Sequence, residues 1–261
     1  MEVTLIGYTV PNFTQTYSED DDPNKLIYTA LAQCYNSSFN PRDDKYPENL
    51  TMEKIISHVV KSGHTSVIEH VKLNFLIENV SRALTHQLVR HRIASYSQKS
   101  QRYTDGSDFT YVVPPSISKN AFNNEAFELL MEEIMSVYKG FVDGGVPYED
   151  ARFILPNACT TNIVVSMNFR SLGDFFAKRM CQRAQWEIRE LANRMSTICR
   201  EFAPTIFKDN KLGFASCIQN GFCKEEKSCG MMPKLTDLKN AYKILENRKK
   251  EMEEFFNNEI L

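Results

Sequence analysis

Two segments of this 261-residue chain alternate apolar and polar residues, the period of a half-buried β-strand. In the first, every second residue from Val71 to Ile77 is apolar, and in the second the apolar positions run from Ile163 to Phe169. A third strand is expected in the N-terminal EVTLIGYTV. The alternation predicts strands that bury one face against other elements.

Much of the rest has the period of amphipathic helices, about 3.6 residues. Residues 51–63 are a clear case, with Thr51 as the N-cap and Gly63 as the C-terminal stop. A long helix is expected from Ser171 to Phe202, with Asp174 completing a capping box. Further helices are expected over residues 25–35, 80–92 and 126–145, and in a C-terminal helix with Leu238, Leu245, Met252 and Phe255 facing inward.

The composition indicates an ordinary globular protein, with 42% hydrophobic and 25% charged residues. A formal charge of -2 disfavours a general nucleic-acid binder, because any cationic patch is then local. The N-terminus has no positively charged signal region, and no apolar run approaches the roughly 20 residues of a membrane span, so we expect a cytoplasmic protein.

The chain turns polar near residue 205. This change predicts a catalytic domain over residues 1–205, followed by a C-terminal tail over residues 206–261. The tail carries Cys217, Cys223 and Cys229 at even spacing, without the paired C-x-x-C spacing typical of zinc sites. We therefore expect no metal, with loose thiols favoured over zinc. The terminal amphipathic helix predicts a docked tail or a subunit contact.

Residues 90–103, RHRIASYSQKSQRY, hold four permanent cations, five hydroxyls and two carboxamides, and no carboxylate. Guanidinium groups bind two oxygens of a phosphate or carboxylate at once, and hydroxyls add neutral donors. The segment therefore predicts a site for a small anion such as a nucleotide phosphate, with Gln87 and Gln98 reading an adjacent ring. A solvated surface and an RNA-contact strip remain alternatives, because Tyr96 and Tyr103 permit base stacking.

Several common catalytic signatures are absent from the sequence. Ser100 has no recognisable triad partners, and neither G-x-S-x-G nor H-E-x-x-H occurs. No G-x-G-x-x-G follows a strand and no Walker A motif is present, so a nucleotide cofactor would be held by another route.

Arg179 falls over Leu172 and Phe175 at the edge of an apolar helical stripe. A guanidinium in that position needs an anionic or carbonyl partner. Asn168 and Arg170 share a face at the end of the second strand, where ligands commonly dock in α/β sheets.

The segment RHRIASYSQKS resembles the signature of the flavin-dependent thymidylate synthases, an R-H-R followed by seven residues and a serine. Three further blocks resemble the same family in order: GHTSVIEH, NFRSL and RMCQRAQWEIRELA. The resemblance implies an α/β fold of the mixed α+β kind, with a central mixed sheet flanked by helices and no Rossmann unit. It also implies a homotetramer whose active sites lie between subunits.

The resemblance implies that the enzyme makes dTMP from dUMP. The one-carbon donor would be 5,10-methylenetetrahydrofolate, and reducing equivalents would pass from NADPH through bound FAD. Arg179 matches the arginine that polarises the uracil ring, so no cysteine nucleophile is needed.

The match assigns further residues to dUMP and to FAD. The residues that would bind dUMP are Gln87, Leu88, Val89, Arg90, Gln98, Lys99, Ser100, Gln101, Arg102, Arg152 and Arg179. Those on the FAD side would be His64, Ser66, Arg90, His91, Arg92, Gln98, Asn168, Phe169, Arg170 and Asp174. The sequence departs from the family pattern at Gln98, Asp174 and Arg183, and contact of Arg183 with folate or flavin stays open.

Overall fold

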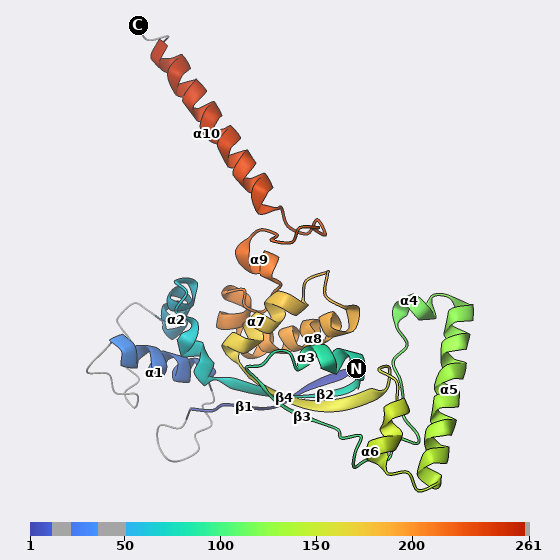
Figure 1. Cartoon of the computed structure of the whole chain (residues 1–261). Coiled ribbons are helices and arrows are strands. Elements are labelled where there is room, and N and C mark those ends of the chain that lie inside the picture. The colour runs from blue at the N-terminus through green and yellow to red at the C-terminus, as the bar shows by residue number, and fades with distance from the viewer. Residues whose placement is uncertain (12–21, 36–50, 259–261) are drawn as a thin grey trace.

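The computed structural model describes residues 1–11, 22–35 and 51–258. Within these residues, four strands form one sheet in the order β1-β2-β4-β3 (Figure 1). Every pair of neighbours is antiparallel, so the expectation of a mixed sheet was wrong. Alternation along a strand indicates which face is buried and carries no information on the direction of its neighbours. The strands are β1 (Glu2–Tyr8), β2 (Lys72–Ser81), β3 (Ser95–Gln98) and β4 (Thr160–Asn168).

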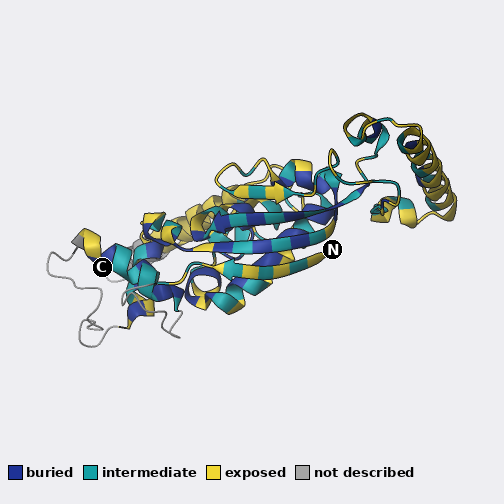
Figure 2. Cartoon of the chain, turned by 90° about the horizontal axis from the view of Figure 1, so that it is seen from below, coloured by how far each residue is buried: buried dark blue, intermediate teal, exposed yellow. Residues whose placement is uncertain are grey.

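The two alternating segments form the centre of the sheet, as predicted. Phe75 of β2 lies opposite Val165 of β4, and both are fully buried. Their neighbours along each strand are only partly buried, and Figure 2 shows this alternation with the sheet seen from below. One face of the sheet therefore supplies the main core.

Helices cover that face of the sheet (Figure 1). The longest of them is α8 (Trp186–Phe202), which packs beside α7 (Phe169–Arg179) and α3 (Arg82–Leu88). Four further elements of the described structure contribute buried residues to the same core: α1 (Pro23–Tyr35), α2 (Met52–Lys61), the 3-10 helix η1 (Thr65–His70) and the π-helix η3 (Thr205–Asp209). Thr51 caps α2 through the backbone N–H of Lys54, as predicted.

The expected long helix from Ser171 to Phe202 is two helices. α7 ends at Arg179, and the side chain of Gln185 starts α8 by accepting hydrogen bonds from the backbone N–H groups of Glu187 and Ile188. The predicted cap was also wrong, because Asn168 is the N-cap of α7 and its side chain accepts from the N–H of Ser171. Asp174 therefore lies inside α7 and completes no capping box.

The chain around residue 90 also differs from the prediction. β2 continues through Val80 to Ser81, and α3 ends at Leu88, so the expected helix over 80–92 is shorter at both ends. Ser95–Gln98, for which the sequence predicted no strand, forms the edge strand β3 beside β4.

A second, smaller cluster around Phe109 and Met131 lies beside the sheet. Its main element is α5 (Ala121–Asp143), which stands apart from the sheet in Figure 1. It begins before the helix expected over residues 126–145 and has Gly144 as its C-cap. Three short elements complete this region: α4 (Pro115–Ser118), α6 (Tyr148–Ala151) and the 3-10 helix η2 (Arg152–Ile154).

The C-terminal part contains α9 (Ser216–Asn220) and α10 (Leu235–Asn258), and α10 projects away from the rest of the chain (Figure 1). Leu238 and Leu245 are exposed in this chain, so the expectation that they face inward was wrong. The side chains of Met252 and Phe255 lie outside the described residues. Among the described helices, none is long and apolar enough to cross a membrane.

Candidate active site

The turn that carries Arg90, His91 and Arg92 follows the end of α3 and is fixed by Tyr96 of β3. The Tyr96 hydroxyl shares its one proton between the backbone oxygens of Leu88, at 2.9 Å, and His91, at 2.8 Å. Burial raises the pKa of Tyr96 to about 12, so the hydroxyl keeps the proton it donates. β3 therefore anchors the basic turn against the last turn of α3.

Arg179, at the end of α7, reaches this turn. Its Nε donates to Nε2 of His91 at 3.0 Å, and its Nη2 donates to the backbone oxygen of Gln87 at 3.4 Å. The expectation that Arg179 needs an anionic or carbonyl partner is met by the backbone oxygen of Gln87, while the imidazole partner was not expected. Within the described residues, Nη1 makes no hydrogen bond, so one end of the guanidinium remains able to donate to a ligand.

The electrostatics of this cluster favour a neutral imidazole beside a charged guanidinium. Burial, reinforced by the charges of Arg179 and Lys178, lowers the pKa of His91 to about 4. The rings of His91 and Phe175 pack edge to face, with their centroids 5.0 Å apart. Burial and the nearby Arg90 also lower the pKa of Arg179, and its guanidinium stays charged because arginine is not deprotonated in proteins. We call Gln87, Arg90, His91 and Arg179 the Arg179 cluster.

A second group of predicted residues gathers around Glu149, which we call the Arg102 cluster: Ser100, Arg102, Glu149 and Arg152. Nε and Nη2 of Arg102 donate to Oε2 of Glu149 at 3.1 and 2.9 Å, and Nε of Arg152 donates to the backbone oxygen of Glu149 at 3.1 Å. The Ser100 hydroxyl accepts from the N–H of Arg102 at 3.1 Å. The arginine side chain of the pair is 49% exposed, so it is accessible to a ligand.

Gln98 occupies the end of β3 and is held by two threonines. Its Nε2 donates to the hydroxyls of Thr85, at 3.0 Å, and Thr161, at 3.4 Å. These contacts fix the amide orientation and leave its carbonyl oxygen as an acceptor for a ligand. Lys99, the next residue, continues the chain into a polar cavity.

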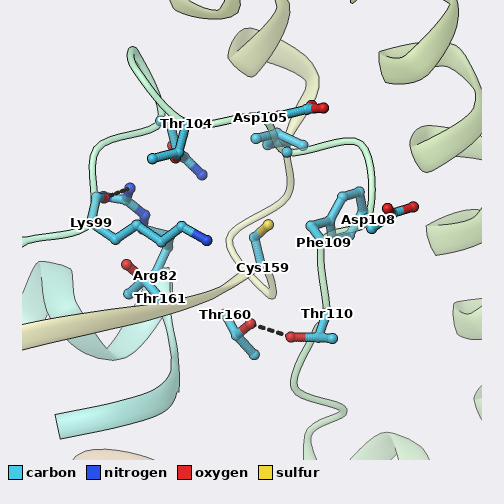
Figure 3. A pocket seen from close by; sticks show the side chains of 13 residues that line it. Arg82, Lys99, Thr104, Asp105, Asp108, Phe109, Thr110, Cys159, Thr160 and Thr161 are labelled. Carbon is cyan, nitrogen blue, oxygen red and sulfur yellow. Dashed lines mark hydrogen bonds between the residues drawn. The ribbon is translucent and has the colours of Figure 1, made fainter.

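This cavity has a volume of about 220 Å³ and lies between β4 and the segment 99–110 (Figure 3). The amino group of Lys99 and the sulfur of Cys159 turn toward one space, whereas the carboxylates of Asp105 and Asp108 point away (Figure 3). Burial raises the pKa of Cys159 to about 11, so this thiol is protonated near neutral pH. Lys99 and Gln101 are the only predicted substrate residues among those that line it.

Arg82 also lines the cavity, and sequence reasoning assigned it no role. Its Nη2 donates to the backbone oxygen of Lys99 at 2.8 Å, while its Nε is buried without a hydrogen-bond partner in the described structure. One feature of the sequence could have indicated a role for Arg82, namely its position eight residues before Arg90.

Glu187 is a second residue that sequence reasoning missed. The residue is only 3% exposed, and its carboxylate accepts from the backbone N–H of Ser81 at 2.8 Å and from the Ser81 hydroxyl at 2.5 Å. Ser81 in turn caps α3 by accepting from the N–H of Leu84. Glu187 therefore fixes the start of the helix that ends beside the Arg179 cluster.

The residues predicted on the FAD side lie mostly around η1 and the start of α7. Nη1 of Arg170 forms an ion pair with Oε1 of Glu69 at 2.6 Å. Phe169 is fully buried against Phe207, so only its backbone is available to a ligand. Asn168 serves as the cap of α7. The exposed members of the set are His64, Ser66, Arg90, Arg92, Arg170 and Asp174.

The predicted dUMP residues thus fall into separate groups in one chain. No hydrogen bond or ion pair among the described residues joins the Arg179 cluster to the Arg102 cluster. Leu88 is fully buried and Val89 is exposed beside the Arg179 cluster. A ligand that touches both clusters would need additional protein surface to surround it.

The family model described as "Thymidylate synthase complementing protein" matches residues 15–205. A flavin-dependent thymidylate synthase from Nitratidesulfovibrio vulgaris is 46% identical over 229 residues, which cover 81% of this chain and 91% of the relative. This chain belongs to the flavin-dependent thymidylate synthase family. A second family member, from Clostridium tetani, is 39% identical over 259 residues, covering 93% of this chain and 97% of the relative.

A solved flavin-dependent thymidylate synthase supports the fold. The crystal structure of the Helicobacter pylori enzyme complexed with FAD and dUMP matches with a TM-score of 0.60 and 24% identity, covering 80% of this chain and 99% of that one. The predicted membership of this family is therefore confirmed by sequence, and the helix-covered sheet agrees with a solved member.

Proposed function

We propose that this chain converts dUMP to dTMP. The one-carbon unit comes from 5,10-methylenetetrahydrofolate, the hydride comes from NADPH-reduced FAD, and tetrahydrofolate is released. The names of the relatives and the bound FAD and dUMP of the Helicobacter pylori structure support this reaction. The observation that carries it is the half-buried Arg179 guanidinium held between His91 and the backbone of Gln87.

Arg179 activates the uracil ring by charge. A neutral His91 leaves the local positive charge on the guanidinium, and Nη1 is available to the ring. A cation in a partly dry site stabilises the negative charge that develops on the ring, which makes C5 of dUMP nucleophilic. This role requires no thiolate, and the protonated Cys159 and Cys199, whose pKa values burial raises, fit such a mechanism.

The remaining dUMP residues bind and orient the nucleotide. The guanidinium groups of Arg90, Arg102 and Arg152 suit the phosphate, and Ser100 adds a neutral donor. The amide oxygen of Gln98, fixed by two threonines, suits an N–H of the base. Because no hydrogen bond or ion pair joins the Arg179 and Arg102 clusters among the described residues of one chain, we place each site between subunits of a homotetramer, with one cluster from each of two chains.

FAD fits the exposed residues around η1 and the start of α7. His64 and Ser66 offer hydrogen-bonding groups, and Arg92 and Arg170 offer positive charge to its pyrophosphate. Arg170 is held by Glu69 in this chain, so the flavin phosphate would replace or extend that ion pair. When bound, FAD supplies the hydride that completes the methyl group.

The reaction is tested by tritium release from C5-labelled dUMP. Purified protein loaded with FAD should be yellow, dUMP should perturb the flavin spectrum, and tritium should be released when folate donor and NADPH are present. Omission of the folate donor is the control and should leave no dTMP. A yellow protein that forms no dTMP under these conditions would refute the proposed activity, and a chain that takes up no FAD would refute the cofactor as well.

A further inference from the structure

Four of the seven cysteines line one hollow that is separate from the residues described above. Its volume is about 370 Å³, and it lies between the end of α7 and the segment that links α9 to α10. Cys181 follows α7, Cys217 lies on α9, and the other two belong to the linking segment. The thiols thus come from three parts of the chain: Cys181, Cys217, Cys223 and Cys229.

The four thiols lie near one another in space as well as around one hollow. The Cys217 sulfur has electrostatic interactions with each of the other three. Cys223 is only 7% exposed, and its backbone is fixed by a hydrogen bond from its N–H to the oxygen of Pro233 at 2.7 Å. In contrast, Cys34, Cys159 and Cys199 do not line this hollow.

The segment between α9 and α10 has few buried apolar side chains to hold it in place. Residues 224–227, KEEK, are all exposed, and the chain turns through Gly221 and Gly230 at positive φ. An ion pair of 3.6 Å joins Arg183 to Glu225, and both partners are about half exposed. Such exposed pairs contribute little, and small units without a core commonly depend on a metal or a cross-link for stability.

We propose that Cys181, Cys217, Cys223 and Cys229 bind a thiophilic transition-metal centre. Four sulfur ligands are the set that Zn²⁺ and iron–sulfur clusters prefer. Each thiol gives up its proton to become a ligand, and the negative charge that results faces Lys178, Arg183 and Lys224, which line the same hollow.

The four sulfur atoms have to come together around the metal. As the side chains lie, no group of three or more His, Cys, Asp or Glu among the described residues is placed to hold a metal ion. The four thiols therefore border the hollow without meeting at one point. Cysteine has a single side-chain dihedral to adjust, and residues 224–227 of the linking segment are exposed, so metal binding would require these thiols and this segment to move together.

Metal content of the full-length protein, purified without oxygen and without chelators, tests the centre directly. We expect either about one zinc per chain, or iron together with acid-labile sulfide. Cys217→Ser combined with Cys223→Ser should abolish the metal, whereas Cys34→Ser, which alters an exposed cysteine outside the hollow, should retain it. Equal metal content in these variants would overturn the proposal.

Thiol protection provides a measurement that does not depend on any variant. The metal-free, reduced protein is alkylated with iodoacetamide with and without added Zn²⁺, and separately after reconstitution with iron and sulfide. The four named thiols should be protected by one of these metals while Cys34 reacts equally in all samples. If neither treatment protects them, the four residues are loose thiols and the proposal is wrong.

Discussion

Nε of Arg179 donates a hydrogen bond to Nε2 of His91 at 3.0 Å, joining two residues separated by 88 positions in the sequence. The imidazole must be neutral at Nε2 to accept, and its lowered pKa of about 4 is consistent with that state. The contact thus orients the guanidinium and leaves its charge in place, whereas a carboxylate partner would neutralise it.

Arg179→Ala should lower kcat by about 10²- to 10³-fold, the range seen when one donor that stabilises developing charge is removed. The protein should keep its fold and its bound FAD, measured by circular dichroism and by flavin absorbance. Arg194→Ala, which removes an exposed guanidinium from α8, should leave kcat unchanged. Wild-type turnover in Arg179→Ala would end the assigned role.

The lowered pKa of His91 predicts that the folded protein loses stability in acid. The unfolded chain binds a proton at this residue below its ordinary pKa of 6.5, whereas the folded chain binds it only near pH 4. Unfolding free energy should therefore fall as the pH drops from 6.5 to 4. His91→Gln keeps an acceptor but does not titrate, so its stability should depend less on pH in denaturant titrations over that window. His86→Gln, at an exposed histidine of α3, should keep the wild-type slope, and identical slopes for wild type and His91→Gln would contradict the prediction.

Glu187→Gln should destabilise the protein by about 1–3 kcal/mol, because an amide nitrogen would then face the buried donors of Ser81. The measurement is the free energy of unfolding in urea. Glu190→Gln on the same helix removes an exposed ion pair and should change stability by less than about 1 kcal/mol. Equal effects from the two variants would show that Glu187 does not anchor α3.

Ser100→Ala should weaken dUMP binding by about five- to tenfold and leave residual turnover, because the hydroxyl contributes one hydrogen bond to the anion site. Flavin-detected dUMP titration gives the dissociation constant. Ser97→Ala, at an exposed position of β3, is the matched control. Complete loss of turnover with unchanged dUMP affinity would instead indicate a nucleophilic serine.

Mixed tetramers test whether sites form between chains. Arg179→Ala and Arg102→Ala proteins should each be inactive, and co-expression should restore about a quarter of the wild-type sites if the two residues come from different chains of a symmetric, randomly mixed assembly. The readout is the rate of dTMP formation per bound flavin. Without any recovery in confirmed mixed tetramers, both residues would have to act from one chain.

The strands that alternate strongly, β2 and β4, could be predicted because every second side chain enters the core. β3 could not, because SYSQ contains a single apolar ring and pairs with β4 only at the edge of the sheet. The break after Arg179 was missed because Met180 and Ala184 continue the helical period across it, and no glycine or proline marks it. The direction of neighbouring strands is likewise absent from a single-strand pattern.

For the site, the family resemblance assigned Arg179 and Gln87 to the same substrate, and a hydrogen bond joins them in the structure, while their role at dUMP stays a prediction. Glu149 and Glu187 carried no such signal, because each acts on residues far away in the sequence: Glu187 meets Ser81 across 106 positions. A carboxylate on an amphipathic helix is usually solvated, and only the tertiary structure reveals that Glu187 is buried.

β4 passes into α7 at Asn168 without any intervening loop. An inserted or deleted residue at this junction would rotate the helix by about 100° relative to the sheet and carry Arg179 away from its imidazole partner. Segment length should therefore be invariant here, while Gly144 and Gly145 form an exposed turn, where extra residues are better tolerated. Engineers who wish to attach reporter tags or graft peptides into this scaffold should choose the second location.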